Sequence, residues 1–248
     1  MYVITVIEKE ELMGQDIIQI NKLRKVYRLE DEKVVALGGI NAKIQKGEMC
    51  CIFGTSGSGK STLLNHLAGM EKPTSGSIII GKTDITKLNE EQMVSFRRKH
   101  IGFIFQAYNL LPGLTALENV ALPMMFQGYG KKERNKRATE MLKKVGLEKR
   151  LNHYPTQMSG GQQQRVGIAR AFVTHPEVIF ADEPTGNLDT KTTAQIMSMI
   201  TDMAVNNKQT IVLVTHDPKM ASYADRILTL IDGEIVKDER KTQKGEQR

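Results

Sequence analysis

The sequence has no tryptophan, and aromatic residues make up only 5% of its 248 residues. It contains no apolar run of about 18 residues, so we expect no membrane-spanning helix. The N-terminal stretch MYVITVIEKEELMGQD lacks the charged-then-apolar order and the cleavage site of a signal peptide. The two cysteines, Cys50 and Cys51, are adjacent in an apolar stretch. That placement favours buried thiols in a reduced, cytosolic protein over a disulfide or a metal site.

The remaining composition is that of a globular protein. Hydrophobic residues make up 40% of the chain, enough for one large domain or for a core domain with a subdomain. The formal charge of +7 indicates an anionic partner, which could be a nucleotide, a nucleic acid or an acidic lipid. Many soluble proteins carry as much charge, so the motifs have to decide between these partners.

The apolar pattern predicts an α/β fold. Short strand-like runs recur at 17–20, 49–53, 77–80, 101–105, 178–181, 210–215 and 226–230. Three of them, MCCIF, VIFA and TIVLVT, are almost continuously apolar, as in strands buried on both faces of a parallel sheet. Helical patterns follow at 60–69, 163–173 and 191–204. Such alternation is typical of a mostly parallel sheet covered by helices.

The middle of the chain has a different pattern. Residues from about 87 to 158 are mostly helix-prone, and we interpret them as an inserted α-helical subdomain with helices at 115–127 and 132–145. One domain is expected to span 1–238, followed by a charged, disordered tail at 239–248. The first twelve residues precede Met13 and are either an extra strand or the product of a misassigned start codon.

A complete phosphate-binding motif, GTSGSGKS, follows the strand MCCIF and opens the next helix. Its glycines let the backbone wrap phosphate groups, and the N–H groups at the helix start supply positive potential. Lys60 is expected to reach the β- and γ-phosphates, and the Ser61 hydroxyl to bind Mg²⁺. The predicted nucleotide-binding residues of this segment are Gly54, Thr55, Ser56, Gly57, Ser58, Gly59, Lys60, Ser61 and Thr62.

Two further strand ends carry chemistry. In VIFADEP, Asp182 is suited to hold Mg²⁺ through water, and Glu183 to polarise the attacking water. His216 follows the strand TIVLVT, and we expect it to contact the γ-phosphate. In open α/β sheets ligands bind where such strands end, so Glu183 and His216 are the predicted catalytic residues.

With these motifs in place, the chain resembles the ATPase subunit of an ABC transporter over nearly its whole length. MSGGQ at 158–162 resembles the family signature, with Met158 in place of leucine, and GNLD at 186–189 resembles the D-loop. The resemblance implies an ABC-type P-loop core with an antiparallel β subdomain. It also implies that Gln106 contacts nucleotide and Mg²⁺, and that Tyr27 stacks on adenine.

The resemblance also explains why a second glycine-rich turn is present. In the family, two subunits face each other head to tail, and each ATP lies between the P-loop of one and the signature of the other. It therefore implies an ATP-dependent homodimer with Mg²⁺. The residues expected to act on the partner's nucleotide are Ser159, Gly160, Gly161, Gln162 and Asp189.

The function implied is an ATPase at the inner face of the membrane that drives a permease on a separate chain, with no nucleic-acid partner. The segments 97–124, 154–171 and 180–189 look most like the macrolide-export and lipoprotein-release group. The alternative is a mechanotransmitting or signalling ATPase that moves no solute. The substrate stays open.

Two segments keep alternative interpretations. The stretch 131–150 carries nine basic and three acidic residues, which predicts an amphipathic helix with either a solvated basic face or a contact with anionic lipid. Met124, Met125 and Phe126 are either core residues or part of a groove for the permease.

Overall fold

A computed structural model describes residues 14–29 and 32–241, and these residues form two compact units. The first unit comprises the described residues up to Lys87 together with those from Val212 onward, and the second runs from Leu88 to Ile211. The expected extra strand within residues 1–12 lies outside the described residues.

The first unit contains an antiparallel sheet with strand order β2-β1-β4-β5. Its strands are β1 (Asp16–Leu29), β2 (Glu32–Gln45), β4 (Ser75–Ile80) and β5 (Thr83–Asp84). The 3₁₀ helix η1 (Ile85–Lys87) follows β5. This sheet is the antiparallel β subdomain that the family resemblance implied.

The same unit holds the strands that position the phosphate-binding motif. β3 (Met49–Phe53) pairs in parallel with β9 (Arg226–Ile231), and β10 (Glu234–Arg240) pairs antiparallel with β9. β8 (Thr210–Thr215), whose first two residues are assigned to the second unit, follows β3 in the strand order. The helices are α2 (Lys60–Leu67) and the short α8 (Pro218–Ala221). All six side chains of β8 are buried, as its apolar run predicts.

The end of this unit differs from the sequence-based expectation. Glu239 and Arg240, assigned to the charged tail, are the last residues of β10, and Arg240 pairs with Arg226. Most β10 side chains are exposed, so the strand carries charges on both faces and lacks an apolar pattern. The rest of the expected tail, from 242 onward, lies outside the described residues.

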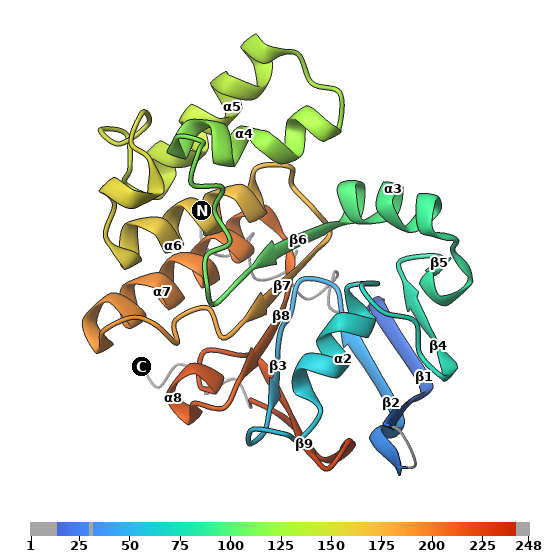
Figure 1. Ribbon diagram of the computed structural model, residues 1–248. Coiled ribbons are helices and arrows are strands. Elements are labelled where there is room, and N and C mark those ends of the chain that lie inside the picture. Colours follow the sequence, from blue (N-terminus) through green and yellow to red (C-terminus); the bar gives the residue numbers. More distant parts are fainter. Residues whose placement is uncertain (1–13, 30–31, 242–248) are drawn as a thin grey trace. The chain divides into compact units, whose positions relative to one another are not determined.

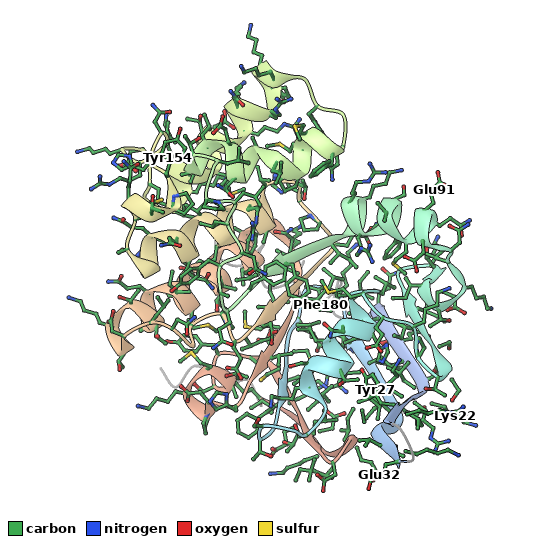
Figure 2. All side chains as sticks on the ribbon, viewed as in Figure 1. Lys22, Tyr27, Glu32, Glu91, Tyr154 and Phe180 are labelled. Carbon is green, nitrogen blue, oxygen red and sulfur yellow. The ribbon has the colours of Figure 1, made fainter. Side chains whose placement is uncertain are left out.

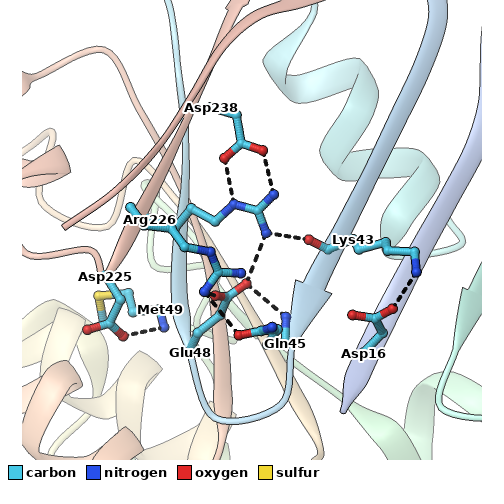
Figure 3. A network of polar contacts seen from close by, with 9 residues as sticks. Asp16, Lys43, Gln45, Glu48, Met49, Asp225, Arg226 and Asp238 are labelled. Carbon is cyan, nitrogen blue, oxygen red and sulfur yellow. Dashed lines mark hydrogen bonds and ion pairs between the residues drawn. The ribbon is translucent and has the colours of Figure 1, made fainter. Parts of the chain in front are cut away.

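A network of charges joins the ends of these strands (Figure 3). Arg226 makes two hydrogen bonds to the Asp238 carboxylate, of 2.7 and 2.6 Å, and donates a third to the Lys43 carbonyl. Its guanidinium also lies 3.5 Å from the buried carboxylate of Glu48. The network therefore links β2, β9 and β10 around one buried acid.

The second unit is mostly helical, with β6 (Ile101–Ile104) and β7 (Val178–Asp182) paired in parallel. The helices are α3 (Glu90–His100), α4 (Ala116–Phe126), α5 (Lys131–Lys144), α6 (Gly160–Phe172) and α7 (Thr190–Asn207), with a 3₁₀ turn, η2, at Pro155–Gln157. α6 contacts α4, α5 and α7, so it is the central helix of this unit (Figure 1).

Local sequence explains where these helices begin. Thr115 and Ser159 each cap a helix through a reciprocal bond with the residue three positions later, Glu118 and Gln162. The expected α/β class and the helical insert are confirmed. Among the described residues, none of the helices combines the length and the apolar character needed to cross a bilayer.

Candidate functional site

The phosphate-binding motif connects β3 directly to α2, in the first unit. Gly57 and Gly59 have φ angles of 83° and 100°, which side chains other than glycine adopt only with strain. A Cβ on Gly54 would collide with the Leu230 carbonyl, and one on Gly59 would lie 2.7 Å from the Ala36 carbonyl. The glycines are therefore required both by backbone conformation and by close packing of the loop.

The N-terminus of α2 is left without a side-chain cap, because Gly59 occupies the cap position. Lys60 is buried, and its Nζ donates a 2.7 Å hydrogen bond to the Thr55 carbonyl across the loop. Ser58 Oγ is buried without a hydrogen-bond partner among the described residues, and Ser61 is exposed. Uncapped N–H groups, a lysine ammonium and free hydroxyls at one loop are the donors that phosphate binding needs.

Tyr27 and His216 belong to the same unit. Tyr27 lies on β1, half-buried, and its hydroxyl donates a 2.8 Å hydrogen bond to the Glu71 carboxylate. Burial raises the pKa of the Tyr27 hydroxyl, Glu71 raises it further, and a hydrogen bond with Thr62 lowers it. His216 directly follows β8 and is exposed, as its position in the sequence predicts.

In the second unit the structure brings Gln106 to the segment that follows β7. Gln106 is exposed two residues after β6, and its carbonyl accepts a 3.1 Å hydrogen bond from Asn187 Nδ2. A Cβ on Gly186 would lie 2.7 Å from Gln106 Nε2, so this glycine makes room for the glutamine side chain. Because β6 and β7 are parallel neighbours, both segments leave the sheet at the same edge.

The two predicted acidic residues lie at that edge. Asp182 is the last residue of β7, and Glu183 follows it with a φ of 42°. A left-handed backbone is uncommon for glutamate, so the surrounding structure holds this residue in a conformation that it would not favour by itself. The carbonyl of the next residue, Pro184, accepts a hydrogen bond from the buried Gln164 of α6.

The signature turn forms one wall of an open groove of about 570 Å³ within the second unit. Ser159, Gly160, Gly161 and Gln162 line it together with the Asn187-Leu188-Asp189 segment. A Cβ on Gly161 would lie 2.8 Å from Thr192 Cγ2 at the start of α7, so only glycine lets the two helix starts approach. The groove therefore joins all five residues that were predicted to act on a partner's nucleotide.

Ser159 and Asp189 also have structural roles that the sequence analysis did not assign. Ser159 Oγ accepts from the Gln162 N–H, while Gln162 Oε1 accepts from the Ser159 N–H at 3.1 Å. Asp189 caps α7 and accepts hydrogen bonds from the Thr192 hydroxyl and N–H, which hold the pKa of the carboxyl below its usual value. Ser159 still has its hydroxyl proton to donate.

Sequence reasoning missed two residues that support this groove, Tyr108 and Arg170. A Cβ on Gly160 would lie 2.8 Å from the Tyr108 hydroxyl, so the tyrosine lies against the signature turn. Tyr108 has a φ of 59°, and Arg170 of α6 donates a 2.8 Å hydrogen bond to its carbonyl. Tyr108-Asn109 carries no recognised motif, and only the tolerance of asparagine for left-handed backbone hinted at a tight turn here.

The methionine segment of α4 divides between core and surface. Met124 is fully buried, so of the two interpretations left open by the sequence, the core one applies to it. Met125 and Phe126 are exposed, and Phe126 lines a cavity of about 270 Å³ with Leu122, Pro123, Phe103 and Phe105. Arg97, Arg98 and Arg170 also line this cavity, so a mostly apolar lining includes three basic side chains.

Comparisons with known proteins decide the family. The model of the family described as "ABC transporter" matches residues 37–186. This chain belongs to that family. The ABC transporter ATP-binding protein YvrO of Bacillus subtilis is 48% identical over 223 residues, covering 90% of this chain and 97% of YvrO.

Solved ABC structures agree with this membership. The dimeric post-hydrolysis structure of the ATP-binding cassette MJ0796, bound to ADP and Pi, superposes with a TM-score of 0.83 at 43% identity, covering 90% of this chain and 98% of that one. MacB of Escherichia coli O157:H7, a macrolide export ATP-binding/permease protein, is 45% identical over 222 residues, but the match covers only 34% of MacB. The chain is therefore an ABC ATPase cassette, and its predicted site residues are divided between its two units.

Proposed function

We propose that two copies of this ABC ATPase close around two ATP molecules and that this closure drives a permease on a separate chain. The observation that carries the proposal is the groove along Ser159–Gln162 and Asn187–Asp189, which offers uncharged donors at a helix N-terminus. In a head-to-tail dimer, this second anion-binding helix start would complete the nucleotide site that the P-loop of the other subunit begins.

Within one subunit the P-loop binds the phosphates of ATP. Lys60 would leave the Thr55 carbonyl and reach the phosphates, exchanging one acceptor for a charged one. Tyr27 would stack on adenine. The phosphate assignment rests on the motif and on the donor-rich loop described above, and the Tyr27 assignment rests on the family resemblance.

Mg²⁺ would be held by Ser61, Gln106 and Asp182. Among the described residues no cluster of three or more histidine, cysteine or acidic side chains could hold a metal ion without help. Mg²⁺ is commonly bound by one or two protein oxygens together with substrate phosphates, and hydroxyl, amide and carboxylate oxygens suit it. The residues therefore fit an ion that arrives with the nucleotide.

Glu183 would polarise the attacking water, and His216 would contact the γ-phosphate. Glu183 directly follows the end of β7, and its backbone is left-handed there. Removing the Glu183 charge tests this role: Glu183→Gln should bind ATP normally and lose nearly all turnover.

The permease would dock on the cavity that Phe126 lines. Its apolar lining residues would pack against a hydrophobic helix side chain, and the arginines would donate hydrogen bonds to acidic or carbonyl groups beside it. Similarity to the macrolide export protein MacB favours export, of antimicrobial compounds or in a lipoprotein-release type of system. Such a subunit would lie at the inner face of the membrane, held there by the permease.

Two candidate roles have weaker support. A mechanotransmitting or signalling ATPase would use the same dimer, and reconstitution with the permease would distinguish it by hydrolysis without solute movement. Contact with anionic lipid would use the exposed Lys131, Lys132 and Lys136 of α5. Arg137 is already paired with Glu133 at 2.7 Å, which leaves the lysines to carry that contact.

A further inference from the structure

The side chains of Lys25, Tyr27 and Glu71 in the first unit contact one another, and we call these three residues the Tyr27 cluster. The Tyr27 hydroxyl donates to Glu71 Oε2 at 2.8 Å, and Lys25 Nζ lies 2.5 Å from Glu71 Oε1. The same ammonium lies 4.8 Å from the centroid of the Tyr27 ring. Lys25 and Tyr27 both lie on β1, whose pairing with β2 is irregular between Lys25 and Val26, and both side chains reach the Glu71 carboxylate.

The cluster is joined to the helix that starts at the phosphate-binding loop. The Glu71 carbonyl lies 2.8 Å from Nδ1 of His66, which is in the last turn of α2 and only 1% exposed. A carbonyl can only accept, so Nδ1 carries the proton, and burial lowers the pKa of His66 in keeping with a neutral ring. Lys25 Nζ also donates to the Lys72 carbonyl at 3.1 Å.

Through these contacts one residue, Glu71, is bonded at both ends. Its side chain fixes the Tyr27 hydroxyl, and its backbone is fixed to α2. Burial raises the pKa of the Glu71 carboxyl, but hydrogen bonds from Lys25 and Tyr27 outweigh this and the pKa lies below its usual value. Glu71 is therefore ionised at neutral pH and accepts both bonds as a carboxylate.

The geometry of the Tyr27 ring fits a platform more closely than a core residue. Tyr27 is half-buried on β1 (Figure 2), and the ammonium covers one face of its ring. A base that stacked on this ring would use the opposite face. Partly exposed ion pairs add little to stability, so the Lys25–Glu71 pair stabilises the fold only slightly, although three side chains lose conformational entropy to form the cluster.

We propose that Lys25 and Glu71 are positioning residues that hold the Tyr27 ring at a fixed distance from α2, so that one nucleotide can engage the ring and the phosphate-binding loop together. This inference rests on the proposed function, in which Tyr27 stacks on adenine. Because the ring is already ordered, nucleotide binding does not have to reduce its conformational entropy, and affinity is higher for that reason.

The test is equilibrium binding of two probes, ADP and inorganic tripolyphosphate, to the full chain by titration calorimetry. Glu71→Ala and Tyr27→Phe should each weaken ADP binding about three- to tenfold, the fold-change that corresponds to one typical intramolecular hydrogen bond. Tripolyphosphate binding should not change, because it does not use the ring. Glu71→Gln, which keeps an acceptor for the hydroxyl, should recover part of the ADP affinity.

In a double-mutant cycle, Tyr27→Phe/Glu71→Ala should lose less ADP affinity than the sum of the two single losses, because both single variants remove the Tyr27–Glu71 bond. Tyr27→Phe also removes the hydrogen bond with Thr62, so its single loss should be at least as large as that of Glu71→Ala. Glu91→Ala, on an exposed side chain of α3 (Figure 2), is the matched control and should bind both probes as wild type does. In steady-state hydrolysis, KM for ATP should rise in Glu71→Ala while kcat stays unchanged.

Equal losses for ADP and tripolyphosphate would overturn the inference, because they would indicate general damage to the unit. So would wild-type ADP affinity in Glu71→Ala while Tyr27→Ala binds ADP weakly, a result that would leave the proposed function standing. A wild-type chain that binds neither probe would instead refute the proposed function itself.

Discussion

Replacing Arg226 by methionine should destabilise the protein strongly, because it removes one of the two guanidinium groups that lie beside the buried Glu48 carboxylate (Figure 3). The Glu48 side chain is 0% exposed, and that of Arg226 is 10% exposed. Removing one partner of a buried ion pair typically costs about 3–5 kcal/mol. The 47% exposed Asp238 can recover its hydration, so its lost bonds add little.

Arg240 provides partial compensation. Its Nη1 lies 3.3 Å from Glu48 Oε2, although that oxygen accepts no hydrogen bond in this geometry. We therefore expect Arg226→Met to lower the free energy of unfolding by about 2–4 kcal/mol, somewhat less than a fully isolated charge would. Urea unfolding followed by circular dichroism at pH 7 measures this directly.

Glu48→Gln is the informative partner variant. Burial raises the pKa of Glu48 above its usual 4.5, so the folded state binds this proton more tightly than the unfolded state. The charged carboxylate thus costs stability above its folded pKa, and that cost disappears as the pH falls below 4.5. Glu48→Gln should have nearly the same free energy of unfolding as the wild type at pH 7, and should be the less stable of the two at acid pH, where the wild-type carboxyl is protonated.

Either of two results would refute this reasoning. A loss under about 1 kcal/mol in Arg226→Met would show that the guanidinium does not compensate a buried charge. An equal, large loss in Glu48→Gln at pH 7 would show that the charge of Glu48 is itself stabilising.

Two further variants test the chemistry and the docking surface. Glu183→Gln should lower kcat for ATP by about 10²–10⁴ and leave the Kd for ATP unchanged, whereas Lys60→Ala should raise the Kd, because the ammonium acts on bound and reacting phosphates alike. Steady-state kinetics together with a binding titration distinguish the two effects. If Glu183→Gln turned over ATP within a few-fold of the wild-type rate, another residue would be the base. Phe126→Asp should lower recovery of the permease complex and permease-stimulated hydrolysis while sparing ATP binding, and Met125→Asp, on the neighbouring exposed residue outside the cavity, is the matched control. Equal recovery of the complex in both variants would mean that the cavity is not the docking site.

The parts of the fold that depend on local pattern could be predicted from the sequence. β3, β7 and β8 are short apolar runs with strand-end chemistry, and the P-loop has a fixed spacing. β10 was missed because most of its side chains are exposed, and α3 because Met93 and Phe96 are its only buried residues. An amphipathic signal needs a broad apolar face, and β10 and α3 have none; β10 is instead placed by its pairing with β9, and α3 by its contact with β6.

The candidate site shows the same division. The signature and D-loop residues could be named from motifs, but their convergence on one groove depends on Gly161 approaching Thr192, which no spacing reveals. Tyr108 is held by Arg170 from 62 positions away, so the contact has no local signature. Met124 and Met125 have the same residue type, and only helix packing places the first inside and the second outside.

Light scattering on the Glu183→Gln protein tests the central claim most directly, because ATP then stays intact. The account predicts a dimer with ATP and a monomer with ADP, since ADP lacks the γ-phosphate that both half-sites contact. Adding Ser159→Arg should abolish the dimer by placing bulk in the groove twice per pair, while Thr156→Arg, on an exposed side chain three residues earlier, should leave it intact. A monomer with ATP in the single variant, or an undiminished dimer with Ser159→Arg added, would contradict the claim that the signature groove is the second half of the nucleotide site.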